Sequence, residues 1–213
     1  MALRLHAFPL SPRSFKVLFA AHQIGIEYEL VPISFVAGDH RTARFSELNP
    51  NQRVPVLEHD GYSLWESNAI VQYLAALKPA SGYLPVELRE RMSAVKWQFW
   101  ESGHWDPACA VFMFQRFVKP KFGLGEADPA EIKRGEQEMA KLAPVLDAQL
   151  TQTRYVAGER MTVADLSLAS TLCSWEQVQM PIADYRGIQR WLAEFRALPA
   201  WTRTVALQSA KAA

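Results

Sequence analysis

The chain has 213 residues, of which 49% are hydrophobic, and a formal net charge of +1. That length exceeds one small domain and falls short of two large ones, and the balanced charge without a long basic run argues against nucleic acid or an anionic membrane surface as a partner. No apolar run reaches the roughly 18 residues of a membrane-spanning helix, and the N-terminus lacks the apolar core of a signal peptide. Cys109 and Cys173 lie in apolar contexts typical of buried thiols, so we expect a soluble, cytoplasmic protein.

The first third of the chain predicts alternating strands and helices. Residues 3–7 alternate apolar and polar side chains, as a strand does. Phe15 and Phe19 share one face of a following helix, which Gly25 ends. Residues 28–33 predict a second strand, after which the chain is irregular for some twenty residues.

A hairpin follows this irregular stretch. Residues 54–57 predict a strand, Asp60-Gly61 is a favoured two-residue turn, and residues 62–65 predict the returning strand. A helix with apolar side chains at helical spacing comes next, and Pro79 stops it. The order strand, helix, strand, strand, strand, helix predicts an α/β domain that resembles the thioredoxin-like fold.

The start of the hairpin and the start of its helix together suit an extended peptide. A cis bond before Pro55 would turn the N–H and C=O of Val54 outward, so that a peptide could pair there as an extra strand. Ser67 is a good N-cap for the helix, whose N-terminus would offer free N–H groups to a carboxylate. Glu66 could pair with a ligand ammonium group. Each feature alone also fits a plain hairpin with a capped helix, but the whole string in order favours a tripeptide ligand.

The turn before the first helix reads Ser11-Pro12-Arg13-Ser14. A disulfide oxidoreductase would carry Cys-x-x-Cys at this point, so the serines argue against exchange through a thiol of the protein. Ser11 is a good N-cap before a proline, and its hydroxyl could instead donate a hydrogen bond to a ligand thiolate. A hydroxyl donor and a helix N-terminus both favour an anion. Ser14 is the rival for this role, although its side chain should face differently.

The remaining two thirds predict an all-helical domain. Residues 78–85 form a linker, which divides a thioredoxin-like domain over residues 1–80 from a helical domain over residues 87–213. Thr162 and Asp165 fit a capping box at the start of a core helix. One apolar stripe of the helical domain consists of Leu88, Met92, Val95 and Phe99.

With these motifs, the chain resembles the cytosolic glutathione S-transferases over essentially its whole length. The first 80 residues are similar to the serine-type phi, theta and zeta classes. The Ser-Ser-Cys string of the zeta class is missing, and Ser-Pro-x-Ser is also similar to the tau class, so the class stays open. The resemblance implies glutathione as co-substrate and a homodimer.

The resemblance also implies roles for single residues. Ser11 matches the catalytic serine of those classes. Val54 and Pro55 match the cis-proline element that pairs with the cysteinyl backbone of glutathione. Glu66 and Ser67 match the pair that binds its γ-glutamyl end.

The glycyl end of glutathione has two candidate partners by the same resemblance. His40 matches a histidine that binds the glycyl carboxylate, although it could equally be a solvated loop residue. Arg53 stands where those classes have Gln or Lys, and its cation could hold the same carboxylate. Gln52 replaces the usual glycine before Arg53, so the resemblance does not determine the backbone conformation at this position.

The second substrate is expected to be a small hydrophobic electrophile bound between the domains. The candidates for the wall of its site are Phe8, His104, Trp105, Phe112 and Gln115. Each of them could instead serve ordinary core packing. No metal site is expected, because the five histidines show no ligand spacing.

These observations predict a glutathione S-transferase that ionises glutathione and directs its sulfur at the electrophile. A free thiol titrates near pH 8.5 and attacks only as the thiolate, so stabilising that anion is the core of the chemistry. The reaction could be conjugation, dehalogenation, peroxide reduction or isomerisation. The alternatives are a non-catalytic carrier or an interaction module of the same fold. A glutaredoxin-like reductase is disfavoured, because the helix start lacks a cysteine.

Overall fold

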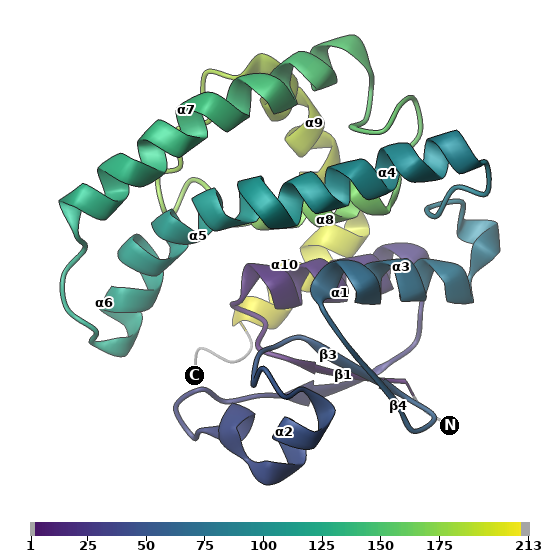
Figure 1. Cartoon of the computed structure of the whole chain (residues 1–213), viewed down its shortest axis with the longest axis vertical. Coiled ribbons are helices and arrows are strands. Elements are labelled where there is room, and N and C mark those ends of the chain that lie inside the picture. Colours follow the sequence, from purple (N-terminus) through teal and green to yellow (C-terminus); the bar gives the residue numbers. More distant parts are fainter. Residues whose placement is uncertain (1–2, 210–213) are drawn as a thin grey trace. The chain divides into compact units, whose positions relative to one another are not determined.

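The computed structural model describes residues 3–209, which fall into two compact units (Figure 1). One unit combines Met1–Leu84 with Arg196–Ala213, and the other is Pro85–Phe195. The first division lies within the linker that the sequence predicts. The last segment, however, clusters with the N-terminal unit and not with the helical one.

The N-terminal unit is built on a four-stranded sheet in the order β2-β1-β3-β4. Its strands are β1 (Arg4–Ala7), β2 (Glu29–Pro32), β3 (Val56–His59) and β4 (Tyr62–Trp65). The pairing of β1 with β2 is parallel, whereas β3 is antiparallel to β1 and to β4. The hairpin turn has positive φ angles at Asp60 (51°) and Gly61 (82°), as the favoured tight turn requires. The predicted thioredoxin-like fold is confirmed.

Helices cover both faces of this sheet (Figure 1). The helical segments of this unit are α1 (Pro12–Ile24), η1 (Asp39–Arg41), α2 (Ala43–Leu48), α3 (Ser67–Leu77), η2 (Pro79–Ser81) and α10 (Pro199–Ser209). On one face lie α1 and α3, and α2 lies on the other. On the α2 side, Phe45 packs in a buried cluster with Ile33, Val54 and Val56. On the other side, Trp201 of α10 meets the rings of Phe15 and Phe19 edge to face, at 4.9 and 5.2 Å between centroids.

A histidine of α1 also ties α10 to this unit. The Thr204 hydroxyl donates to the Ala200 carbonyl, and its oxygen lies 2.8 Å from Nδ1 of His22. The Tyr28 hydroxyl lies 2.8 Å from Nε2 of the same ring. A neutral imidazole satisfies both contacts, donating from Nδ1 and accepting at Nε2. Burial, reinforced by the charge of Arg203, lowers the pKa of His22 to about 4 from its ordinary value of 6.5.

This shift predicts that His22 stabilises the fold at neutral pH and less in acid. Because the folded-state pKa is the lower one, the contribution is complete above about pH 6.5 and is lost as the pH falls through 4. One pKa unit corresponds to about 1.4 kcal/mol; since the ring is only partly buried, we expect a contribution on the order of 2 kcal/mol. The melting temperatures of the native protein and His22→Gln should therefore differ clearly at pH 7 and converge near pH 4. A gap that stays constant over this range would contradict the assignment.

The second unit contains only helices among its regular elements, as far as residues 85–195 are described. They are α4 (Leu88–Trp100), α5 (Asp106–Met113), α6 (Lys119–Phe122), α7 (Pro129–Gln152), α8 (Val163–Thr171) and α9 (Arg186–Arg196). Two π-helical segments, η3 (Glu101–Trp105) and η4 (Phe114–Val118), join α4, α5 and α6. The predicted all-helical character of this domain is confirmed.

The predicted capping box at the start of α8 is present. The Asp165 carboxylate accepts hydrogen bonds from the N–H and the hydroxyl of Thr162, at 2.9 and 3.2 Å. It also accepts from the Val156 N–H at 2.9 Å and from the Trp191 indole of α9 at 3.1 Å. Burial raises the pKa of Asp165 to about 6, although these four hydrogen bonds act in the opposite direction. One carboxylate therefore joins α8, α9 and the loop between α7 and α8.

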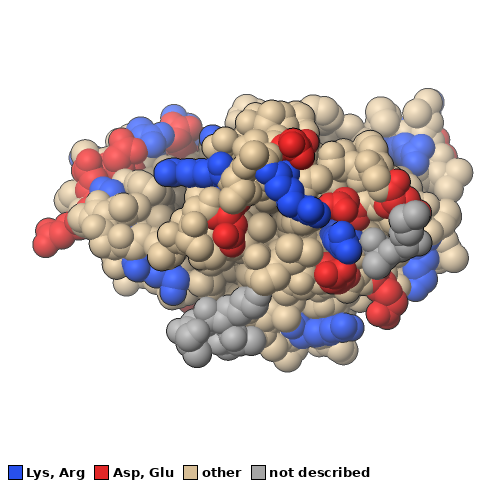
Figure 2. All heavy atoms as spheres, turned by 90° about the horizontal axis from the view of Figure 1, so that it is seen from below, with Lys and Arg blue, Asp and Glu red and all other residues tan. Residues whose placement is uncertain are grey.

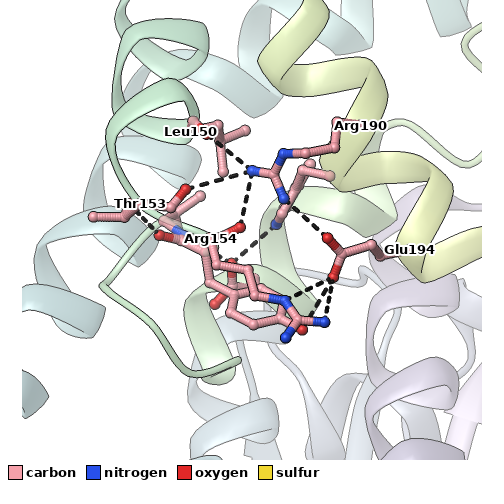
Figure 3. Close-up of polar contacts among 9 residues, drawn as sticks. Leu150, Thr153, Arg154, Arg190 and Glu194 are labelled. Atoms are coloured by element: carbon pink, nitrogen blue, oxygen red, sulfur yellow. Dashed lines mark hydrogen bonds and ion pairs between the residues drawn. The ribbon is translucent and has the colours of Figure 1, made fainter.

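The same loop is held from α9 by an arginine (Figure 3). The Arg190 guanidinium donates to the carbonyls of Leu150, Thr153 and Arg154, at 2.9, 3.4 and 3.1 Å. Its other nitrogen donates to Glu194 at 2.9 Å. The last carbonyls of a helix have no partner within the helix, so Arg190 closes the end of α7 from outside.

The surface charge, the hydrophobicity of the helices and the burial of the cysteines can be compared with the expectations from the sequence. Figure 2 shows acidic and basic side chains interspersed on the visible face. No helix among the described residues is both long and apolar enough to cross a membrane. Cys109 is buried as predicted, and burial raises the pKa of its thiol well above the usual value. Cys173, which was also expected to be buried, is only partly so.

Candidate functional site

Ser11 lies at the N-terminus of α1 with a hydroxyl that makes no capping hydrogen bond. Its backbone is fixed, because its N–H donates to the Phe8 carbonyl and its carbonyl accepts from the Phe15 N–H, both at 2.8 Å. The residue is half-buried and extended, with φ −77° and ψ 128°. Of the two functions that the sequence allows for this side chain, backbone capping is not used, and the hydroxyl remains available to a ligand.

Ser14 has a different environment from Ser11. It is fully buried, and its hydroxyl oxygen accepts the Phe8 N–H at 3.1 Å. This contact fixes the loop between β1 and α1, which carries Ser11. As predicted, the two serines face different surroundings.

The segment before β3 has a fixed backbone. The Asn49 side chain is buried, donates to the Arg53 carbonyl at 2.7 Å and accepts the Asn51 N–H at 2.9 Å. Gln52, which stands where a glycine was expected, adopts a left-handed φ of 54°. Only a few per cent of non-glycine residues do so. The chain therefore adopts a left-handed backbone at this position with Gln52 in place of a glycine.

The bond between Val54 and Pro55 is cis. Val54 is buried and precedes β3, so its backbone lies outside the sheet ladder. Arg53 beside it is exposed, and within the described part of the chain its guanidinium makes no hydrogen bond or ion pair. The Val54 backbone, which lies outside the sheet ladder, therefore has the Arg53 cation as its neighbour in the chain.

Glu66 occupies the N-cap position of α3, and Ser67 is the first helical residue. The sequence-based prediction that Ser67 is the N-cap is therefore wrong by one position. Glu66 has φ 71° and ψ 111°, a conformation that costs a non-glycine residue about 1–3 kcal/mol and that clusters at functional sites. Its side chain is exposed, whereas Ser67 is buried at the helix start.

One neighbour of Ser67 was missed by the sequence reasoning. The ammonium group of Lys16 on α1 donates to the Ser67 hydroxyl at 3.0 Å and to the Asn68 side chain at 3.1 Å. A lone lysine within the apolar run of α1 is the signal that could have pointed to it.

His40 lies in the 3-10 turn η1 and packs on Phe35, with 4.6 Å between ring centroids. Its Nδ1 atom is buried and has no hydrogen-bond partner among the described residues. The ring is half-buried, so the alternative of a freely solvated loop residue does not describe it.

The candidates for the electrophile site have varied surroundings. Phe8 is half-buried in the N-terminal unit and meets Phe35 edge to face. In the helical unit, the Trp105 indole donates to the Thr171 hydroxyl at 2.8 Å, and Gln115 accepts the N–H of Asp128 at 2.8 Å. These two side chains and Phe112 are buried, which favours a packing role, whereas His104 is exposed. Within residues 3–209, no cluster of three or more His, Cys, Asp or Glu side chains could hold a metal ion.

Comparison with known proteins covers almost the whole chain. The family model for the N-terminal domain of glutathione S-transferase matches residues 1–76, and that for the C-terminal domain matches residues 104–199. Glutathione S-transferase 3 of Zea mays is 32% identical over 213 residues, or 96% of this chain and 93% of the relative.

Solved structures give the same result. Glutathione transferase F7 from Populus trichocarpa has a TM-score of 0.88 and 28% identity, covering 97% of this chain and 99% of that one. A theta-class glutathione S-transferase from Xanthomonas axonopodis pv. citri, solved with glutathione bound, also has a TM-score of 0.88 and 28% identity, covering 96% and 97%. By fold and by these matches, the chain belongs to the glutathione S-transferase family, with relatives of the serine-type phi and theta classes.

Proposed function

We propose that this glutathione transferase uses Ser11 to stabilise the thiolate of bound glutathione and directs that sulfur at a hydrophobic electrophile. The observation that carries the proposal is the Ser11 hydroxyl, which stands at a helix N-terminus and makes no capping hydrogen bond. A donor at this place favours the anionic form of a thiol. The serine keeps its own proton and acts as an oxyanion-hole donor does.

The remainder of the tripeptide has partners in the same unit. The Val54 backbone pairs with the cysteinyl residue as an added strand. Glu66 and Ser67 receive the γ-glutamyl ammonium and carboxylate at the start of α3. Arg53 and His40 hold the glycyl carboxylate, Arg53 through its exposed cation.

The second substrate is an apolar electrophile, and the candidate side chains for its contacts are Phe8, His104, Trp105, Phe112 and Gln115. Of these, Phe8 and His104 are not fully buried, so they are the first to be tested. The aromatic character of the set favours an apolar substrate. Conjugation, dehalogenation, peroxide reduction and isomerisation all draw on the same activated sulfur.

The test uses the native protein and two readouts. Calorimetry should detect saturable binding of glutathione. With an activated aryl halide as the second substrate, the protein should form a thioether, which is measured by its ultraviolet absorbance. Binding without product would favour a non-catalytic carrier of the same fold. Absence of binding would refute the proposal and leave an interaction module.

We also propose a homodimer, in which α4 contributes to the contact with a second copy. Three apolar side chains on one stripe of α4 are exposed, with exposed fractions of 67% for Leu88, 47% for Met92 and 73% for Phe99. Together with Val95 they repeat at intervals of four, three and four residues, the spacing of helices that pack against each other. Exposed apolar side chains in such a row mark a protein contact.

Phe99→Glu should therefore shift the protein from dimer to monomer, because a carboxylate would be buried in an apolar contact. Light scattering coupled to size-exclusion chromatography measures the mass directly. Phe114→Glu is the matched control, since Phe114 is also an exposed phenylalanine but lies outside this stripe. If the Phe99→Glu protein remained a dimer, as the Phe114→Glu protein should, α4 would not be part of the dimer contact.

A further inference from the structure

Lys16 is a lysine buried in the N-terminal unit, with only 2% of its surface exposed. Its neighbours on α1 are the buried residues Phe15 and Val17. Withdrawing an ammonium group from water costs free energy, and an apolar residue of similar volume is often as stable or more stable in such a place. Packing alone therefore does not explain a lysine here.

The ammonium group lies at the start of another helix. Two of the groups that accept from it, the Ser67 hydroxyl and the Asn68 side chain, belong to the first two residues of α3. The N-terminus of a helix already carries a positive partial charge. A cation at this end opposes the helix dipole, but it increases the attraction for an anion.

The direction of the hydrogen bond matters as much as the charge. An ammonium group can only donate, so Ser67 accepts from Lys16 through its oxygen. The Ser67 proton is then left to donate to another acceptor, and the orientation of the hydroxyl is restricted. A carboxylate in front of Ser67 would receive this proton and would gain from the nearby positive charge.

We propose that Lys16 is a positioning residue for the α-carboxylate of the γ-glutamyl group, acting through the Ser67 hydroxyl. This inference rests on the proposed function, since it assumes that Ser67 binds that carboxylate. It concerns binding of one end of glutathione and not the reactivity of the sulfur. Loss of Lys16 should therefore raise KM for glutathione and leave kcat at saturating glutathione nearly unchanged.

The experiment compares Lys16→Met with the native protein on two peptides. One is glutathione, and the other is 4-aminobutyryl-cysteinyl-glycine, which lacks only the α-carboxylate. Calorimetry should show about 10-fold weaker binding of glutathione to Lys16→Met, that is about 1.4 kcal/mol. The decarboxylated peptide should bind both proteins within about twofold. Lys16→Arg, which keeps the charge, should restore part of the affinity for glutathione.

Lys78→Met is the matched control. The Lys78 ammonium also reaches from one helix to the other, since it leaves the C-terminal end of α3 and donates to the Gly25 carbonyl after α1 at 3.2 Å. It is exposed and lies at the opposite end of α3, so its loss should change neither peptide's affinity. Should Lys16→Met fold poorly, Lys16→Gln removes the charge but keeps a donor for Ser67.

Two results would overturn the inference while leaving the proposed function intact. One is an equal loss of affinity for both peptides, which would indicate general damage to the site. The other is unchanged binding of glutathione to folded Lys16→Met. A native protein that binds neither peptide would refute the proposed function itself, and the role of Lys16 with it.

Discussion

Replacing Asp165 with alanine is expected to lower the free energy of unfolding by at least about 4 kcal/mol. The carboxylate is fully buried and accepts four hydrogen bonds, two from Thr162, one from Val156 and one from Trp191. Each buried donor left without a partner costs about 1–3 kcal/mol. Domains are stable by only about 5–15 kcal/mol, so this single change would remove a large part of the total.

Asp147→Ala is a suitable comparison for this experiment. Asp147 is also an aspartate of the helical unit, and its carboxylate accepts the N–H of Ile188 at 3.0 Å. Its loss should cost about 1 kcal/mol. Thermal unfolding followed by circular dichroism measures both. If Asp165→Ala had as high a melting temperature as Asp147→Ala, the hydrogen bonds of Asp165 would not make the large contribution to stability that is expected here.

Ser11→Ala should reduce kcat/KM for thioether formation by a factor of about 10²–10³, the usual effect of removing one donor from an anion-stabilising site. The fold should survive, because the Ser11 side chain makes no capping hydrogen bond and the backbone contacts of Ser11 remain. Glutathione should still bind, since the other proposed contacts are to its ends and its backbone. Steady-state rates at varied glutathione give the ratio.

Ser14→Ala separates the two serines of this turn. Its hydroxyl supports the Phe8 N–H from a buried position, so its loss should cost about 1–2 kcal/mol of stability. The turnover of the folded Ser14→Ala protein should stay within a few-fold of native. If Ser14→Ala were the variant that lost turnover and Ser11→Ala were not, the roles would be exchanged.

Much of the N-terminal unit could be predicted because its local rules are strong. The Asp60-Gly61 turn and the strand over residues 62–65 follow from turn chemistry and alternation, and the structure has both. The capping box at Thr162 and Asp165 is equally local and is also present.

Features that depend on contacts distant in sequence could not be predicted. The pairing of Lys16 with Ser67 joins two helices across 51 residues of sequence. The lysine within the apolar run of α1 is visible in the sequence, but its partner is not. The packing of α10 against Phe15 and Phe19 likewise depends on tertiary contacts of Trp201. The start of α3 was misplaced by one residue because the positive φ of Glu66 is a strained conformation, which propensity alone does not favour.

The ultraviolet absorbance of bound glutathione as a function of pH reports directly whether Ser11 stabilises the thiolate. The native protein should lower the thiol pKa of glutathione by at least about one unit from its free value near 8.5. Ser11→Ala should bind glutathione with a pKa returned close to that of the free thiol. A lowered thiol pKa that persists in Ser11→Ala would show that Ser11 does not stabilise the thiolate, and would assign that role to Ser14 or to backbone donors.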